Sequence, residues 1–587
     1  MGQYASLLLG AVLSVTAPRI GATDTVWAQA EPIWPWEETG RLWLAYASLE
    51  HVPGENGGWP KTMAGICSAL ERIASAAQSP DQAGRAAHTE GRPLAAALNA
   101  LCLEKTRGRP AVTTLDLGAY PRERSYPLGH AFETFASGWG SIRVDPERAA
   151  VWQEMPSALK EDLSYPVSDH SYLHVRIGLR RDLAAWHQDP LGLDLPLSSK
   201  EVDLNEPALG YFHAENERFA FTVGRFQVHW SPSPDFGLAL SRSVPYHNAA
   251  EFALKMPRMR YRFLASSLNP WLEGTPMGDS SGEDYPPGSE AYRQRHYASA
   301  NGAVNFHKRV YAENIKTLFA HRLEGELGPL GLGITEVEII GGKIPDLRDA
   351  GPFVTFHNDF KDGYTNGALS FDATCKLPAG LSLGAELYLD DVQYSQTEGT
   401  GNTASLLGYL AVLRHAFQMR GWACSQSLNI VRTDPFLYGY LQPLNSMASR
   451  QILASNFEVG DSAYVDKYVV DYPIGYLRGG DAFDFWYRME AWNGFKTRLS
   501  LSAAVLAKGD VDLYTPYEDY FASPHDSPSG TAEREFRLRM EGEYRWRRNT
   551  SFHAGAGWQS VWSPERLGGG HADHFQGSLG IAWSLPR

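Results

Sequence analysis

The chain has 587 residues, of which 12% are aromatic and 20% are charged, and its formal net charge is −14. This acidic balance argues against nucleic acid as the partner, because a phosphate-contacting surface needs an excess of lysine and arginine. Four cysteines in a chain of this length exclude a disulfide scaffold. After residue 30 no apolar run is long enough for a membrane-spanning helix, so a passage through a membrane would have to use strands.

The first thirty residues have the pattern of a secretory signal peptide. An apolar stretch covers residues 5–15, and a small-residue cleavage site ends at Ala30. The segment before the apolar stretch carries no lysine or arginine, so a buried N-terminal strand or helix stays open as the alternative. We interpret residues 1–30 as a signal peptide and expect an exported protein.

The next part of the chain has the periodicity of helices. Apolar residues recur at three- and four-residue spacing over residues 61–77, and residues 93–105 are rich in alanine and leucine. The pattern predicts a small helical subdomain within residues 31–111. If the rest of the chain is an outer-membrane barrel, as proposed below, we expect this subdomain on the periplasmic side. Cys67 and Cys102 fall on two helices that could pair antiparallel, so a disulfide and two buried free thiols are both open.

From residue 112 to residue 587 the pattern is that of strands. Apolar and polar residues alternate over residues 171–179 and 575–585, among others. Clear hairpins are expected at residues 367–389, 482–507 and 534–562, and Asn493-Gly494 gives the second of these the strongest short turn signal. The expected strands run about nine to twelve residues, which is longer than is usual in soluble sheets.

The connections between these strands alternate in length. Tight turns alternate with long polar stretches, for example residues 269–294 and 514–532. Together with one apolar face per strand, this predicts an all-β transmembrane β-barrel of about 16–18 antiparallel strands over residues 112–587. A soluble sandwich or propeller would have shorter strands or a fixed repeat. Tryptophans near the expected strand ends would form the interfacial girdles: Trp186, Trp230, Trp271, Trp486, Trp492, Trp546, Trp562 and Trp583.

Residues 217–248 carry the sharpest strand pattern. Alternation runs up to Trp230, prolines at 232 and 234 interrupt it, and a second apolar segment ends at Pro245. We interpret this stretch as one barrel hairpin whose prolines shape a loop at the rim. Its Trp230, Ser231-Pro232, residues 237–241 and Pro245 resemble a W-G-P…L-x-L-S…P block of the capsule-assembly Wzi family. Residues 385–393, which include Asp390 and Asp391, and residues 471–481 resemble two further blocks of that family in the same order.

The resemblance implies a divergent member of an outer-membrane barrel family with a small helical bundle near the N-terminus. It implies a non-catalytic role in attachment or assembly of surface polysaccharide, with the bilayer of a Gram-negative outer membrane and that polysaccharide as partners. The family-marker residues are Trp230, Pro232, Ser241, Pro245, Asp390 and Asp391. Aromatic residues of the expected long loops are candidates for stacking on sugar rings: Trp271, Tyr285, Tyr292, Tyr517 and Tyr520.

Two other functions stay open. One is an outer-membrane pore for small solutes, in which rings of arginine and aspartate set selectivity. The other is a barrel hydrolase that uses His170 or Ser171, which follow Asp169. Neighbouring residues of a strand point to opposite faces, so these three cannot form a relay among themselves. We therefore expect no enzyme activity, no cofactor, no metal site and no nucleic-acid partner.

Overall fold

The computed structural model describes residues 32–33, 61–62, 111–120, 129–134, 140–168, 170–270, 315–341, 344–345, 351, 365–391, 406–439, 443–454, 458–459, 463–494, 496–515, 526–547, 549–566 and 568–586. The predicted signal peptide, nearly all of the predicted helical subdomain, and Cys67 and Cys102 lie outside these residues. The two short strands β1 (Pro32–Ile33) and β2 (Lys61–Thr62) pair antiparallel. The boundaries of the helical subdomain stay a prediction.

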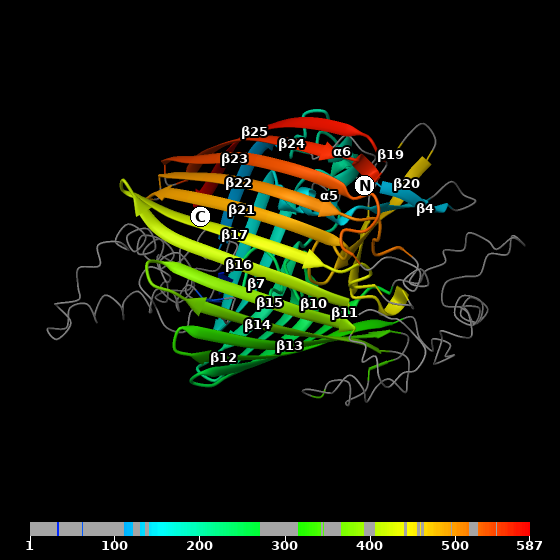
Figure 1. Cartoon of the computed structure of the whole chain (residues 1–587). Helices are drawn as coiled ribbons and strands as arrows, with labels where there is room; N and C mark the ends of the chain where they lie inside the picture. Colours follow the sequence, from blue (N-terminus) through cyan, green and yellow to red (C-terminus); the bar gives the residue numbers. More distant parts are fainter. Residues whose placement is uncertain are drawn as a thin grey trace, which may run out of the picture.

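Eighteen antiparallel strands form a closed barrel, in which the last strand, β25, pairs with β3 (Figure 1). The strands are β3 (Ala111–Ala119), β6 (Leu159–Ser168), β7 (Ser171–Leu179), β8 (Leu209–Glu215), β9 (Phe219–Phe226), β10 (His247–Lys255), β11 (Met259–Leu268), β12 (Lys316–Leu327), β13 (Leu330–Gly341), β14 (Thr365–Lys376), β15 (Leu381–Asp391), β16 (Leu406–Met419), β17 (Trp422–Thr433), β21 (Ala482–Asn493), β22 (Thr497–Lys508), β23 (Glu533–Arg547), β24 (Thr550–Trp562) and β25 (His571–Pro586). The predicted fold class and strand number are confirmed.

The two ends of the barrel differ in their connections. At one end, hairpins such as β12–β13, β14–β15 and β21–β22 close in tight turns, and Gly494 adopts a positive φ of 56° in the third. At the other end the connections are long, and α5, α6, β4 and β20 gather there (Figure 1). We call these the turn end and the loop end. Both the first residue of β3 and the last residue of β25 lie at the turn end.

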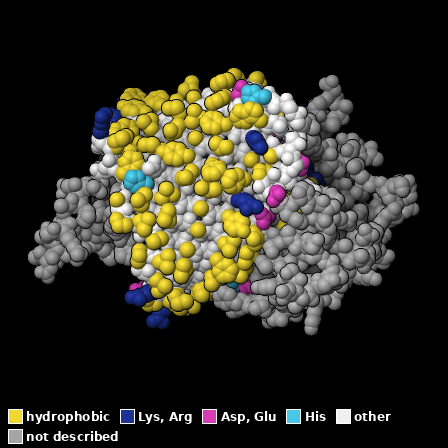
Figure 2. Space-filling view, in the orientation of Figure 1, with side chains coloured by type: hydrophobic (Ala, Val, Ile, Leu, Met, Phe, Trp, Pro, Cys, Tyr) yellow, Lys and Arg dark blue, Asp and Glu magenta, His cyan; other side chains and the backbone are white. Residues whose placement is uncertain are grey.

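The outer face of the barrel is apolar. Large hydrophobic side chains are exposed at alternate positions, as at Phe219, Phe221 and Val223 on β9 and at Leu579 and Ile581 on β25. Figure 2 shows that hydrophobic side chains cover most of the face toward the viewer, with few charged side chains among them. This alternation is the pattern of a barrel whose outer surface contacts hydrocarbon. Among the described residues, none of the helices has the length and apolarity to span a bilayer.

A second sheet of five strands lies at the loop end. It consists of β4 (Gly129–Thr134), β5 (Gly140–Val144), β18 (Ala448–Ala454), β19 (Glu458–Val459) and β20 (Ala463–Pro473), and β5 pairs parallel with β20. Two short helices accompany it, α5 (Pro146–Glu154) and α6 (Leu183–Gln188), capped by the side chains of Asp145 and Asp182. One-turn 3₁₀ helices η2 (Ser199–Glu201), η4 (Pro443–Asn445) and η6 (Pro564–Arg566) lie in the connections. The sequence pattern predicted none of these elements.

Residues 227–246, between β9 and β10, fold into the barrel, and we call them the luminal segment. Val228, Trp230, Leu238 and Leu240 are fully or almost fully buried in one apolar core with inward side chains of the barrel strands. Trp230 and Leu240 form an isolated antiparallel bridge. The first strand of the predicted hairpin is confirmed as β9, but its second strand and its rim loop are wrong, because this part of the chain lies inside the barrel. An extended segment that is buried on both sides has the same apolar run as a buried barrel strand. The periodicity of the sequence therefore cannot distinguish a luminal segment from a strand of the barrel wall.

The predicted tryptophan girdle is correct only in part. Trp546, Trp562 and Trp583 are exposed on the outer face of the last three strands. Trp186 of α6, Trp230 and Trp492 are buried, and Trp486 hydrogen-bonds to Tyr476 inside the barrel. Trp271 lies outside the described residues. The prediction failed at these positions because tryptophans also fill interiors, here the lumen and, for Trp186, the apolar core around α5 and α6.

Candidate functional site: a polar cavity inside the barrel

The three sequence blocks that carry the family resemblance meet inside the barrel. Glu386 on β15 accepts hydrogen bonds from the Ser231 hydroxyl (2.7 Å) and from the backbone amides of Leu238 (3.2 Å) and Ala239 (3.0 Å) of the luminal segment. The amide of Ser241 donates to the carbonyl of Ile474 (3.0 Å), and its hydroxyl donates to that of Gly475. The blocks therefore form one structural unit that holds the luminal segment in place.

Gly475 is required by this close approach. A Cβ atom at this position would lie 1.9 Å from the carbonyl oxygen of Leu238. Tyr438, from the connection after β17, completes the unit. Its hydroxyl donates to the Leu238 carbonyl (2.8 Å) and accepts from the Tyr476 amide (3.1 Å), and its own amide donates to Asp390 (2.7 Å).

The marker residues have structural roles in this unit. Pro232 is buried against Gly384 of β15. A Cβ atom added at Gly384 would lie 3.1 Å from the Cβ of Pro232. Trp230 is buried, with the Arg262 guanidinium 4.9 Å from its ring centroid. Asp391 takes part in a register irregularity between β15 and β16. Pro245 lines the cavity described below.

Helix α5 is attached to the barrel wall by ion pairs. Arg478, within the third block, contacts Glu147 of α5 (2.5 Å), Asp484 of β21 (3.1 Å) and Glu535 of β23 (3.5 Å). Arg537 of β23 contacts the same Glu147 (2.8 Å). The acidic neighbours of Arg478 raise the pKa of its guanidinium, although burial alone would lower it. This cluster fixes the position of α5 in the lumen.

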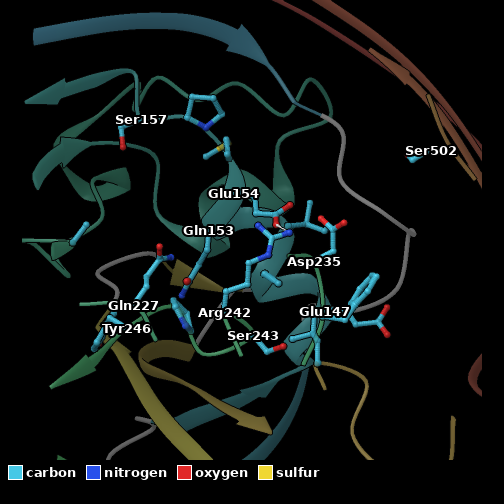
Figure 3. Close-up of a pocket in the computed structure, with 18 of the residues that line it drawn as sticks. Glu147, Gln153, Glu154, Ser157, Gln227, Asp235, Arg242, Ser243, Tyr246 and Ser502 are labelled. Atoms are coloured by element: carbon cyan, nitrogen blue, oxygen red, sulfur yellow. Dashed lines mark ion pairs between the residues drawn. The ribbon is translucent and has the colours of Figure 1, made fainter. Parts of the chain in front are cut away.

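A cavity of about 690 Å³ lies between α5, the luminal segment and the barrel wall. Its wall comes mainly from β3, β6, β7, β21, β22 and β23. In Figure 3, α5 carries Glu147, Gln153 and Glu154 in the centre of the cavity, and Ser502 lies on the wall across from Gln227 and Tyr246. The volume falls in the range of small-molecule sites.

The lining of the cavity is charged and aromatic. Eight basic and five acidic side chains line it, together with Phe236, Trp486 and several amides and hydroxyls. Many of these charges are paired, such as Arg488 with Asp235 (3.0 Å) and Arg242 with Glu154 (3.7 Å, Figure 3). Burial raises the pKa of Glu206 in the β7–β8 connection to about 7. Such a lining can hydrogen-bond a polar ligand and contact its apolar faces.

The predicted sugar-stacking residues Trp271, Tyr285, Tyr292, Tyr517 and Tyr520 lie outside the described residues and stay predictions. His170 is exposed in the β6–β7 turn. The neighbouring Ser171 hydroxyl is hydrogen-bonded to the Ser168 hydroxyl (2.7 Å). Within the described part of the chain no group of three or more His, Cys, Asp or Glu residues could hold a metal ion.

Sequence reasoning missed the cavity. A signal for its wall does exist on β23, where the alternate residues Glu535, Arg537, Arg539 and Glu541 are all charged, in a strand whose other face is largely apolar. A charged face opposite an apolar face indicates a polar lumen. The contributions of α5 and the luminal segment had no comparable signal.

No family model matches the chain, and no curated protein matches it in sequence. Among solved structures, it is similar to Wzi of Escherichia coli, described as a carbohydrate-binding β-barrel of the outer membrane involved in group 1 capsule assembly. The likeness covers 95% of this chain and 100% of that one, at 14% identity and a TM-score of 0.51. OccAB4 of Acinetobacter baumannii (8% identity, 81% and 97% covered, TM-score 0.36) and OprD of Pseudomonas aeruginosa (10%, 81% and 95%, 0.33) are more distant. The chain therefore has the fold of an outer-membrane β-barrel.

Proposed function

We propose that this protein is an outer-membrane barrel that binds surface or capsular polysaccharide and takes part in its attachment or assembly, without catalysing a reaction. The observation that carries the proposal is the filled lumen. Packed segments occupy the loop-end half of the barrel and leave a charged, aromatic cavity beside them. The solved structure with a similar fold, Wzi, is described as carbohydrate-binding and involved in capsule assembly, which supports the same class of ligand here.

The proposed location is the outer membrane of a Gram-negative bacterium, with the turn end on the periplasmic side. Outer-membrane barrels have short periplasmic turns and longer extracellular connections, and this barrel has the same asymmetry. The apolar outer face agrees with this placement. The protein should require detergent for extraction from membranes and should migrate differently in gels before and after heating.

The second candidate is a channel for small solutes, because charged side chains line the lumen. Single-protein conductance in planar bilayers separates the two functions. The polysaccharide-binding proposal expects no ion conductance beyond the leak of the empty bilayer, together with binding of capsular polysaccharide by the purified protein. A stable open conductance without glycan binding would favour the channel. Unchanged capsule retention after deletion of the gene in a capsulated host would contradict the first proposal.

A further inference from the structure

Three inward-facing residues form a row across adjacent strands of the cavity wall. Arg488 of β21 pairs in register with Ser502 of β22, and Ser502 pairs with Arg539 of β23. All three residues line the cavity. Neighbouring strands lie about 4.8 Å apart, so the two arginine Cα atoms are about 10 Å apart. Two guanidinium groups therefore border one small region of the cavity, with a serine hydroxyl between them.

The present partners of these arginines leave donors available. Arg488 contacts Asp235 through one nitrogen (3.0 Å), and Arg539 contacts Glu541 through one nitrogen (2.7 Å). The two side chains are 33% and 44% exposed. A guanidinium has five N–H donors. The Arg539–Glu541 pair is exposed on both sides and contributes little free energy. The Asp235 side chain is only 5% exposed, so its pair with Arg488 stays in place and uses one donor. An incoming anion can therefore bind the remaining donors without displacing a strong interaction.

Small residues around Arg539 leave space for a ligand. Its register partners are Ser502 on one side and Gly557 on the other. At this level the two neighbouring strands carry only a hydroxymethyl group and a hydrogen atom, and the Gln576 Oε1 lies 3.5 Å from the place of a Gly557 Cβ. Space beside a partly exposed guanidinium is what a bound carboxylate needs for a bidentate contact.

The adjacent row, closer to the loop end, is aromatic. Trp486 pairs in register with Ala504, which pairs with Arg537. The Arg537 guanidinium lies 5.9 Å from the Trp486 ring centroid, and Phe236 of the luminal segment lies 5.2 Å from Trp486. Trp486 and Phe236 both line the cavity. A flat apolar surface therefore lies one row away from the anion-binding groups.

We propose that the row Arg488–Ser502–Arg539 binds the carboxylate of an acidic sugar whose ring contacts Trp486. This inference rests on the proposed polysaccharide-binding function and specifies its ligand as a uronic-acid-type saccharide. The two arginines supply charge-assisted hydrogen bonds, the Ser502 hydroxyl supplies one more donor, and the aromatic row contacts the C–H face of the ring. A neutral saccharide of the same size forms only the aromatic and hydroxyl contacts.

The test is isothermal titration calorimetry of the purified full-length protein in detergent with digalacturonic acid and with the neutral disaccharide cellobiose. Arg488→Gln and Arg539→Gln should each weaken digalacturonic acid binding at least about tenfold, since each removes charge-assisted hydrogen bonds. Glu541→Gln should strengthen it, because this change frees Arg539 from its partner. Raising the salt concentration should weaken binding of the acid and leave that of cellobiose unchanged.

Arg545→Gln is the matched control. Arg545 lies on the same strand as Arg539 and pairs with Glu543 (3.0 Å), but it does not line the cavity. This variant should bind digalacturonic acid within about twofold of the unaltered protein. The heat-dependent gel shift checks that each variant is folded.

The outcomes separate this inference from the proposed function. Equal binding of the acidic and the neutral disaccharide overturns the inference while the polysaccharide-binding function stands. Loss of acid binding in the control variant to the same extent as in Arg539→Gln also overturns it, because the effect is then one of overall charge. If the protein binds neither disaccharide nor any capsular polysaccharide, the proposed function fails together with the inference.

Discussion

The Glu386 carboxylate on β15 accepts the backbone amide of Leu238 at 3.2 Å, although the two residues are 148 positions apart in the chain. The same carboxylate accepts from Ala239, Ser231 and Ser370. Glu386 is 3% exposed. A buried acceptor with four donors determines where the luminal segment lies. Without Glu386, the two buried backbone amides would have no hydrogen-bond acceptor, because water does not reach them.

Glu386→Ala should destabilise the protein and loosen the luminal segment. It leaves two backbone amides and two hydroxyls without their acceptor, which we expect to lower the free energy of unfolding by about 3–5 kcal/mol. Urea unfolding in lipid vesicles measures the change, and planar bilayers should show intermittent conductance. Glu543→Ala is the control, because Glu543 is 25% exposed and paired with Arg545; it should cost less than about 1 kcal/mol. Equal effects of both changes would contradict the assigned role of Glu386.

Arg478→Gln should weaken the attachment of α5 to the barrel wall. The change removes the cation that faces Glu147, Asp484 and Glu535. Arg537 still contacts Glu147 and Glu535, but the fully buried Asp484 loses this ion pair, which should cost about 3–5 kcal/mol. Adding Glu147→Gln should recover part of this loss, so a double-mutant cycle should give a coupling of about 1 kcal/mol or more. Strictly additive losses would show that Arg478 does not act through α5.

The stability of the luminal segment should depend on pH through His229. Burial lowers the pKa of this imidazole from 6.5 to about 4, and its Nε2 lies 2.6 Å from the Ser233 carbonyl. Between pH 6.5 and pH 4 the unfolded chain binds a proton that the folded chain does not. Stability should therefore fall as the pH drops through this window, by on the order of 3 kcal/mol in total. His229→Gln should flatten this part of the urea-unfolding profile, and an unchanged slope would contradict the assignment.

Leu579→Arg should destabilise the barrel in lipid. Leu579 lies near the middle of β25 and is 71% exposed on the apolar outer face, so a charge there should cost about 2–4 kcal/mol. Gln576→Arg places the same charge on the opposite face of the same strand and should cost less than about 1 kcal/mol. Refolding into lipid vesicles at a series of urea concentrations measures both. Similar costs would contradict the assignment of the two faces.

Much of the barrel was predictable because its strands obey a simple rule. A strand between hydrocarbon and a wet lumen must alternate, and residues 171–179 do so over exactly the range that becomes β7. The hairpin turn at Asn493-Gly494 was predictable because this pair tolerates positive φ. Both signals are local, and a local pattern is enough to define a hairpin.

The interior was not predictable in the same way. Residues 238–241 are buried on all sides and therefore show the apolarity of a strand, so the pattern predicted a barrel strand where the chain folds into the lumen. Helix α5 has only nine residues, too few for a long apolar stripe, and it is held by the ion pairs of Glu147 and by the burial of Ala149 and Trp152. The row Arg488–Ser502–Arg539 exists only through the register of three strands, and register depends on the whole barrel.

The seam between β25 and β3 sets the order in which the barrel can assemble. Trp583 pairs with Leu115 there, across nearly the whole described chain, whereas most other strand pairs in the barrel are hairpins of consecutive strands. Hairpins close quickly, while contacts between distant parts of a chain carry a large loop-closure entropy. Until β25 arrives, β3 and β24 expose unpaired edges beside apolar faces, and such edges recruit other chains. A chain shortened at Trp562 should therefore aggregate rather than form a smaller barrel.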